Sequence, residues 1–196
     1  MNMSTSKHHS ATTSSARIRR LTLMGLLTAI SIVLILFVQL PIFPAASYLK
    51  YDMADVPILL GAFLLGPAAG LEILLVVCAI QGFFLGGDGV IGFMMHFFSS
   101  GALVLVASLL YKRYQDTKGM VIGLIFGSLA MTALMIPLNL IFTVHFYGVP
   151  QEVVVAGLIP ITIPFNLIKA GLNSVIMFLV YKSTRFLFKK QDFMLH

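Results

Sequence analysis

Long apolar runs separated by short polar stretches dominate this sequence of 196 residues. A helix needs about 20 mostly apolar residues to cross the roughly 30 Å hydrocarbon core of a bilayer. We place six such runs at 21–40, 54–66, 68–86, 90–112, 119–146 and 159–188, the second being the shortest. The pattern therefore predicts an all-α integral membrane protein with six transmembrane helices.

Two boundaries in this pattern depend on prolines. Gly66-Pro67 separates the second run from the third, and a proline there either ends a helix or only kinks one. Asp55 precedes Val56-Pro57, so we expect its side chain to cap the second helix.

The composition supports a membrane protein and excludes a soluble one. The chain is 59% hydrophobic and 10% charged, whereas soluble domains carry roughly 25% charged residues. Its net charge of +6 is not gathered in one patch, so we expect no nucleic-acid partner. Three clusters beside apolar runs hold all of the 13 Lys and Arg residues except Lys50 and Lys169: Lys7, Arg17, Arg19 and Arg20; Lys112, Arg113 and Lys118; and Lys182, Arg185, Lys189 and Lys190.

This charge distribution also predicts the topology. Basic residues concentrate on the cytoplasmic side of membrane proteins. We therefore expect both termini to be cytoplasmic, which requires an even number of spans. The Ser/Thr-rich residues 1–20 are expected to form a disordered tail, 21–190 the membrane domain, and 191–196 a short C-terminal tail. A cleaved signal peptide is the alternative for the N-terminus, but its apolar run of about 18 residues exceeds the usual 7–15.

No motif in the sequence indicates an enzyme. There is no phosphate loop for ATP, and 87–92 matches G-x-G-x-x-G only after a membrane helix, without the strand that a dinucleotide fold requires. Cys78 is the single cysteine. An intramembrane metal enzyme using His96, His145 and Glu152 remains an alternative, although their spacing matches no zinc motif. We expect no cofactor and no metal.

Polar residues inside the apolar runs indicate a binding pocket. Lys169 lies midway along the last run, where an unpaired lysine costs about 2.5–3.5 kcal/mol, so replacing it by Met should leave folding intact. Asn166 and Asn173 share its helix face, and Asn139 with Thr143 forms a second polar pair. The alternative for each asparagine is a hydrogen bond between helices. Taken together, these residues favour a ligand pocket that opens outward.

The segment 41–55 mixes apolar, aromatic and charged residues with two prolines. It is consistent with a lid over such a pocket. An interfacial loop whose aromatic residues lie among lipid headgroups explains the pattern equally well.

Several of these motifs, taken in order, resemble one family. They are Tyr48-Leu49-Lys50-Tyr51-Asp52-Met53-Ala54-Asp55-Val56-Pro57, Gly66-Pro67-Ala68-Ala69-Gly70, Asn139, and Pro164-Phe165-Asn166-Leu167-Ile168-Lys169. The chain resembles the riboflavin-specific substrate-binding (S) components of energy-coupling factor (ECF) vitamin transporters, over nearly its whole length after residue 20. An S component for another vitamin, such as thiamin or biotin, is the alternative.

The resemblance implies a six-helix protein in a bacterial cell membrane that captures riboflavin outside and docks onto a transmembrane coupling subunit driven by two ATPase subunits. It implies that Asn139, Asn166 and Lys169 are polar pocket residues, and that Leu40, Pro41 and Phe43 belong to the lid. The flavin ring would also pack on Met94 or Met95.

The resemblance further implies a docking surface on the first helix, where the family carries an Ala-x-x-x-Ala pattern. Gly25 and Ala29 have that spacing here, and both are small enough for close helix approach. The chain departs from the family pattern in the fourth run. Relatives carry an Asn near the position of Met95-His96-Phe97, and this chain has none there.

Overall fold

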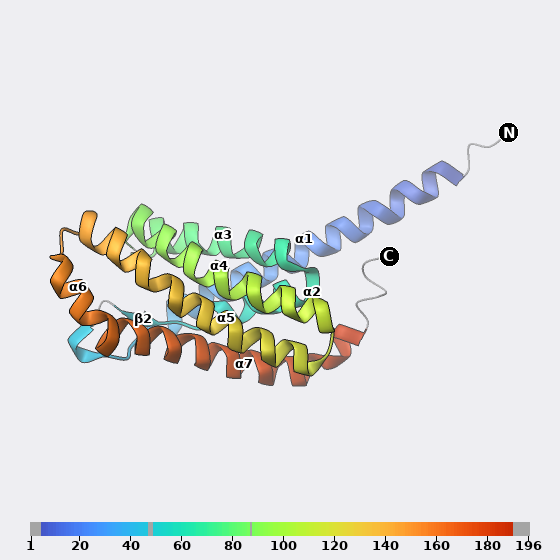
Figure 1. Ribbon diagram of the computed structural model, residues 1–196. Coiled ribbons are helices and arrows are strands. Elements are labelled where there is room, and N and C mark those ends of the chain that lie inside the picture. Colours follow the sequence, from blue (N-terminus) through green and yellow to red (C-terminus); the bar gives the residue numbers. More distant parts are fainter. Residues whose placement is uncertain (1–4, 47–48, 87, 190–196) are drawn as a thin grey trace.

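The computed structural model describes residues 5–46, 49–86 and 88–189, with side chains described from 15 to 184 apart from position 45. The fold is all-α (Figure 1). Its α-helices are α1 (Thr5–Phe37), α2 (Asp55–Leu65), α3 (Pro67–Phe84), α4 (Gly89–Tyr114), α5 (Thr117–Leu138), α6 (Gln151–Gly157) and α7 (Ile163–Lys189).

Five helical stretches in the described residues are long and apolar enough to cross a membrane. They are Ser15–Phe37, Pro67–Phe84, Gly89–Tyr114, Thr117–Thr143 and Gln151–Thr184. The second predicted span corresponds to α2, whose 11 residues extend only about 16 Å. The last stretch begins at Gln151, earlier than the predicted start at 159.

The first helix also begins earlier than the sequence pattern indicated. α1 starts at Thr5, so most of the segment expected to be a disordered tail is helical. No proline or glycine interrupts residues 5–24, and the helix therefore continues backwards through them. Residues 1–4 and the predicted C-terminal tail 191–196 lie outside the described residues.

Gly66-Pro67 ends one helix and starts another. Gly66 has a φ of +96°, a conformation that glycine adopts readily, and Pro67 is the first residue of α3.

The predicted cap at Asp55 is wrong. Asp55 is itself the first residue of α2, the N-cap position belongs to Ala54, and no side chain caps the helix there. Asp55 is instead fully buried against other helices.

Two π-helical turns interrupt the predicted fifth and sixth spans. α5 continues into a π turn at Asn139–Thr143, and a second π turn at Leu158–Thr162 connects α6 to α7. Pro137 and Pro160 lie next to or within these turns, where a proline removes a backbone donor and disturbs the regular helical hydrogen bonds. π turns are frequent at functional sites.

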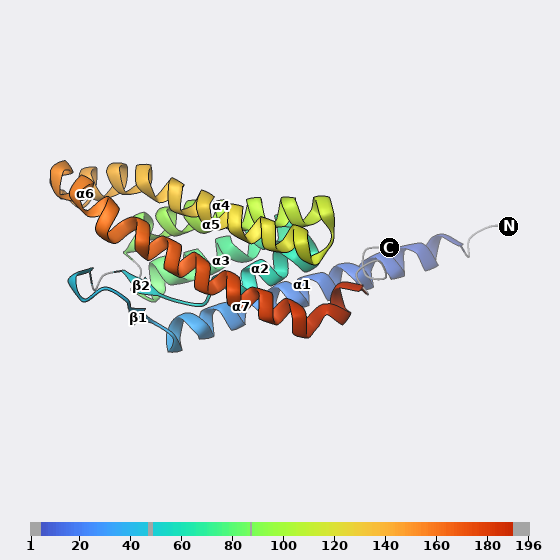
Figure 2. The same cartoon turned by 60° about the horizontal axis from the view of Figure 1, so that its bottom comes forward.

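The segment 38–54, of which the structure describes 38–46 and 49–54, connects α1 to α2 and is called here the 38–54 loop. Strand β1 (Leu40–Pro41) pairs antiparallel with β2 (Lys50–Tyr51), and a short 3-10 helix at Pro44–Ala46 lies between them. Figure 2 shows this loop at the same end of the bundle as α6.

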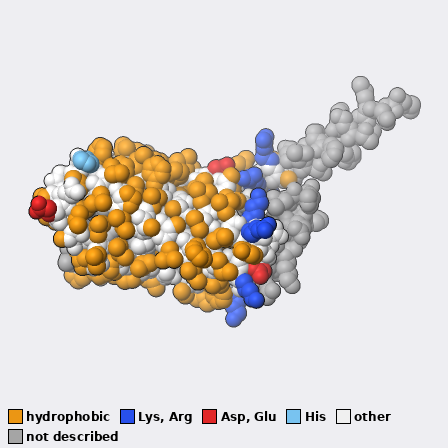
Figure 3. Space-filling model, in the orientation of Figure 1, with side chains coloured by type: hydrophobic (Ala, Val, Ile, Leu, Met, Phe, Trp, Pro, Cys, Tyr) orange, Lys and Arg blue, Asp and Glu red, His pale blue; other side chains and the backbone are white. Residues whose placement is uncertain are grey.

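Close packing in the bundle is clearest between α4 and α5. A Cβ placed on Gly123 would lie 2.6 Å from the backbone oxygen of Ala107, so only glycine permits this approach. On the face shown in Figure 3, apolar side chains cover most of the surface between the two ends of the bundle, and Lys and Arg gather at one end. A bundle that is apolar on its outer surface is typical of a protein embedded in lipid.

Candidate functional site

A cavity of about 840 Å³ lies at the end of the bundle that carries the 38–54 loop and α6, away from the end where Lys and Arg gather in Figure 3. Ligand pockets in proteins usually measure about 300–1,000 Å³. The wall combines the 38–54 loop with the C-terminal halves of α3 and α5, the N-terminal halves of α4 and α7, and α6. Its polar and charged members are Gln39, Lys50, Asp52, Gln81, Asp88, His96, Ser99, Asn139, Thr143, Tyr147, Thr162, Asn166 and Lys169.

Two asparagine amides on this wall lie at the π turns, Asn139 as the first residue of the first turn and Asn166 shortly after the second. Asn139 donates from Nδ2 to the backbone oxygen of Met135 at 2.8 Å, and its Oδ1 accepts from Thr143 Oγ1 at 3.2 Å. Asn166 donates from Nδ2 to the backbone oxygen of Thr162 at 2.8 Å. Each amide has two N–H groups, so each retains a second donor that has no partner among the described residues. Both amides can therefore bind a polar ligand edge without losing their present contacts.

The rest of the wall is largely apolar and suits a flat, hydrophobic ring. It includes Met95, Met131, Met135, Leu85 and Phe165. Methionine adapts its shape to a ligand more easily than branched side chains do. Of the two adjacent methionines considered from the sequence, Met95 is the one that lines the cavity.

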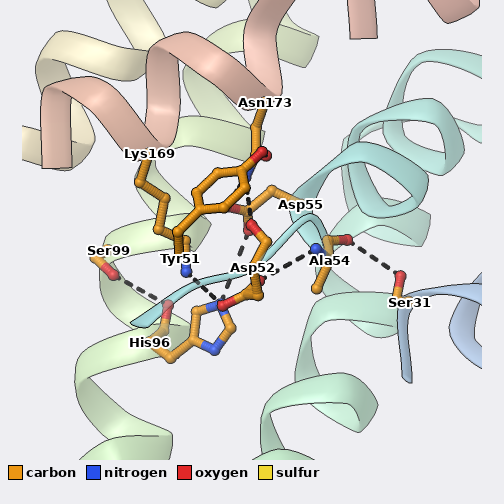
Figure 4. A network of polar contacts seen from close by, with 9 residues as sticks. All are labelled: Ser31, Tyr51, Asp52, Ala54, Asp55, His96, Ser99, Lys169 and Asn173. Carbon is orange, nitrogen blue, oxygen red and sulfur yellow. Dashed lines mark hydrogen bonds and ion pairs between the residues drawn. The ribbon is translucent and has the colours of Figure 1, made fainter. Parts of the chain in front are cut away.

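Lys169 on α7 forms a buried ion pair with Asp52 of the 38–54 loop (Figure 4). Its Nζ lies 2.8 Å from Asp52 Oδ2, and the two side chains are only 9% and 4% exposed. The other oxygen, Oδ1, accepts from the backbone N–H of Ala54 at 3.1 Å. An ammonium group has three donors, so two remain for a ligand in the cavity.

Asn173 also binds the 38–54 loop, from one turn further along α7. Its Nδ2 donates to the backbone oxygen of Asp52 at 3.2 Å and to Asp55 Oδ2 at 3.1 Å, and its Oδ1 accepts from Tyr51 Oη at 3.0 Å. Burial, followed by the charge of Asp52, raises the pKa of the Tyr51 phenol, which therefore stays protonated and donates. Figure 4 shows these side chains converging between the loop and α7.

His96 on α4 completes the polar end of the cavity. Its Nε2 lies 3.8 Å from Asp55 Oδ1, within ion-pair range but beyond hydrogen-bond distance. It occupies the part of the fourth span where the resemblance led us to look for an asparagine. At the mouth of the cavity, partial burial and then the nearby Asp88 raise the pKa of the Tyr147 phenol.

The predicted site residues divide into two groups. Met95, Asn139, Asn166 and Lys169 come together on the cavity wall. Leu40, Pro41, Phe43 and Asn173 are not on that wall. The first three belong to the 38–54 loop, where Leu40 is 59% exposed, whereas Asn173 is fully buried behind the cavity.

The sequence analysis did not identify Asp52 as the ion-pair partner of Lys169. The sequence did carry a signal for it, because one buried cation in an apolar span calls for an acidic partner, and Asp52 and Asp55 are the acidic residues of the adjoining loop and helix start. What the sequence lacked was the contact itself, which joins residues 117 positions apart.

The residues of the alternative metal site do not converge. His145 and Glu152 are exposed, whereas His96 lies in the cavity wall. Within the described ranges, no group of three or more His, Cys, Asp and Glu side chains could hold a metal ion.

The two small residues of the predicted docking surface lie on the outside of α1. Gly25 and Ala29 are both exposed, and a Cβ added to Gly25 would meet no atom of another described residue within 4 Å, its chain neighbours and its own helix backbone aside. This face of α1 is therefore accessible to another helix.

Comparisons with known proteins agree with this geometry. The family model described as "ECF transporter, substrate-specific component" matches residues 19–181. The chain is 32% identical over 174 residues to riboflavin transporter RibU of Staphylococcus aureus, covering 84% of this chain and 89% of that protein. It is 28% identical over 178 residues to riboflavin transporter FmnP of Bacillus subtilis, covering 84% and 91%.

A solved structure shares the fold. It is the S component of a bacterial ECF transporter, and it superimposes with a TM-score of 0.76 and 33% sequence identity over 86% of this chain and 96% of the other. The family is one of transporter components, not of enzymes. The chain therefore belongs to the substrate-specific components of ECF transporters.

Proposed function

We propose that this chain is the riboflavin-binding S component of an ECF transporter and that it binds riboflavin in the cavity described above. One observation carries the proposal. Two amides and an ammonium group, Asn139, Asn166 and Lys169, share one wall of a large and otherwise mainly apolar cavity. The relatives named above are riboflavin transporters, which supports the same ligand here.

The chemistry of riboflavin matches this wall. The pyrimidine edge of its ring presents acceptor, donor and acceptor groups in a row. An asparagine amide can hydrogen-bond to such an edge because it carries both a donor and an acceptor. Asn139 and Asn166 are proposed to hold that edge. Lys169 offers donors only, so it is proposed to bind a carbonyl or a ribityl hydroxyl, while the ring packs on Met95 and Phe165.

The remaining predicted site residues are not on the cavity wall and are proposed to act through the 38–54 loop. Leu40, Pro41 and Phe43 form the portion of the 38–54 loop that would cover bound ligand. Asn173 would hold the base of that loop through its bonds to Asp52 and Asp55, without touching the ligand.

The topology proposed for the membrane has six crossings and cytoplasmic termini. The five membrane-length stretches supply five crossings, and α2 with its flanking residues would supply the shortest. The basic residues at one end of the bundle then face the cytoplasm. The cavity at the opposite end opens to the extracellular side of a bacterial plasma membrane, where riboflavin is captured.

Energy for uptake is proposed to come from partner proteins. The coupling subunit would pack its helices against Gly25 and Ala29, because small residues let two backbones approach closely. Two ATPase subunits would drive that subunit.

Equilibrium titration of the detergent-purified protein with riboflavin tests the proposal. We expect saturable binding at one site per chain, with thiamin and biotin failing to compete. Competition by thiamin or biotin but not by flavins would identify an S component for a different vitamin. The absence of saturable binding of any of these vitamins would refute the proposal.

A further inference from the structure

Asp52 is the most completely engaged carboxylate among the described residues. Both of its oxygens are used: Oδ2 accepts from Lys169 Nζ at 2.8 Å, and Oδ1 accepts from the N–H of Ala54 at 3.1 Å. Its backbone oxygen accepts from Asn173 at 3.2 Å. The residue is 3% exposed, so water does not compete strongly for these bonds.

This arrangement fixes the position of the Lys169 ammonium group. A lysine side chain has a flexible stem of four carbons, and on its own it can present its charge in many directions. Here the carboxylate that receives the ammonium group is itself held by the loop backbone. Asp52 and Lys169 both line the cavity, so the ion pair lies at the surface that a ligand would contact.

The same bonds connect two distant parts of the chain. Asp52 belongs to the 38–54 loop, and Lys169 and Asn173 belong to α7. Tyr51 adds a further bond from the loop to Asn173 at 3.0 Å. The loop is therefore attached to the helix that carries two of the proposed ligand-binding residues, Asn166 and Lys169.

We infer that Asp52 is a positioning residue for ligand binding, which holds the Lys169 ammonium group at the cavity wall. Asp52 acts through Lys169 in this inference and need not touch the ligand. The inference rests on the proposed function, since it takes Lys169 as a contact of riboflavin.

A double-mutant cycle on riboflavin affinity tests the inference. The variants are Asp52→Asn, Lys169→Met and the two combined, with Glu152→Gln as a control because Glu152 is an exposed carboxylate that does not line the cavity. We expect Asp52→Asn to weaken binding about tenfold or more, the effect of losing a charge-assisted hydrogen bond. In the Lys169→Met background, we expect the same substitution to change affinity less than about threefold.

The outcomes separate a positioning role from a purely structural one. Equal losses in both backgrounds would mean that Asp52 acts independently of Lys169, and that result would overturn the inference. Unchanged affinity in Asp52→Asn would overturn it as well. Gel filtration and the melting temperature of the ligand-free variants establish that they are folded.

One further variant covers the case in which Asp52→Asn does not fold. If Asp52→Asn does not fold, Asp52→Glu replaces it in the cycle, because glutamate keeps the charge but moves it by one methylene group. A loss of riboflavin affinity in the wild-type background that does not occur in the Lys169→Met background would again support the inference. Failure of the wild-type protein to bind riboflavin would refute the proposed function itself. Normal wild-type binding with an unaffected Asp52→Asn variant would refute only the positioning role.

Discussion

The ion pair between Asp52 and Lys169 makes a sharp prediction about stability. Removing the ammonium group in Lys169→Met leaves the Asp52 carboxylate buried without its cationic partner. Removing one member of a buried pair typically costs about 3–5 kcal/mol, because the other charge remains desolvated. The sequence alone suggested that Lys169→Met would leave folding intact, but that expectation took the lysine to be unpaired.

The magnitude follows from the geometry of the pair. Its nitrogen and oxygen are 2.8 Å apart and both side chains are less than a tenth exposed, so solvent screening is weak. For a chain of this length, each kcal/mol shifts the melting temperature by about 2–4 °C. We therefore expect Lys169→Met to melt on the order of 10 °C below the wild-type protein.

Thermal unfolding of the ligand-free protein in detergent is the assay, and the double variant Asp52→Asn/Lys169→Met is the matched control. With both charges gone, no uncompensated charge remains, so we expect the double variant to recover a large part of the lost stability. Two results would show that the pair does not stabilise the fold in this way: a Lys169→Met variant as stable as the wild-type protein, or a double variant whose loss equals the sum of the single losses.

Three other substitutions test the cavity, the docking surface and the helix packing. Asn166→Leu should weaken riboflavin binding by about 1–3 kcal/mol, because one amide of the polar wall is lost; an unchanged dissociation constant in titration would exclude that contact. Gly25→Leu should leave binding intact but abolish ATP-driven uptake in cells that supply the partner subunits, and normal uptake would disprove the docking surface. Gly123→Ala should lower the melting temperature, since its new methyl group would collide with the Ala107 backbone, at a cost of about 1–3 kcal/mol. Gly171→Ala is its control, because among the described residues outside its own stretch of helix no atom lies within 4 Å of the added Cβ, and this variant should be at least as stable as the wild-type protein. Equal losses at both glycines would contradict the packing argument.

The five membrane-length helical stretches followed from the sequence because the apolar pattern is a local signal. The break at Gly66-Pro67 was placed at the correct residues, although the sequence left open whether the helix ends or only bends there. The short pairing of Leu40–Pro41 with Lys50–Tyr51 was not foreseen, because two-residue strands leave no periodic pattern. The π turns were not predicted either, since a proline signals an irregular turn but does not specify its hydrogen bonds.

The site was predictable only in part, for a related reason. Residues on one helix face can be grouped by their spacing, and this grouping placed Asn166, Lys169 and Asn173 together. The spacing could not show that Asn173 binds Asp52 and Asp55 while Asn166 faces the cavity. That difference depends on how the 38–54 loop packs against α7, which is a contact between residues more than 100 positions apart.

A crystal structure of the purified protein with riboflavin would show whether the vitamin binds in this cavity. We expect electron density for one flavin ring inside the cavity, with its pyrimidine edge within hydrogen-bond distance of the Asn139 and Asn166 amides and with Lys169 still paired to Asp52. A flavin bound outside this cavity, or one within it that contacts neither amide, would rule out the proposed binding site.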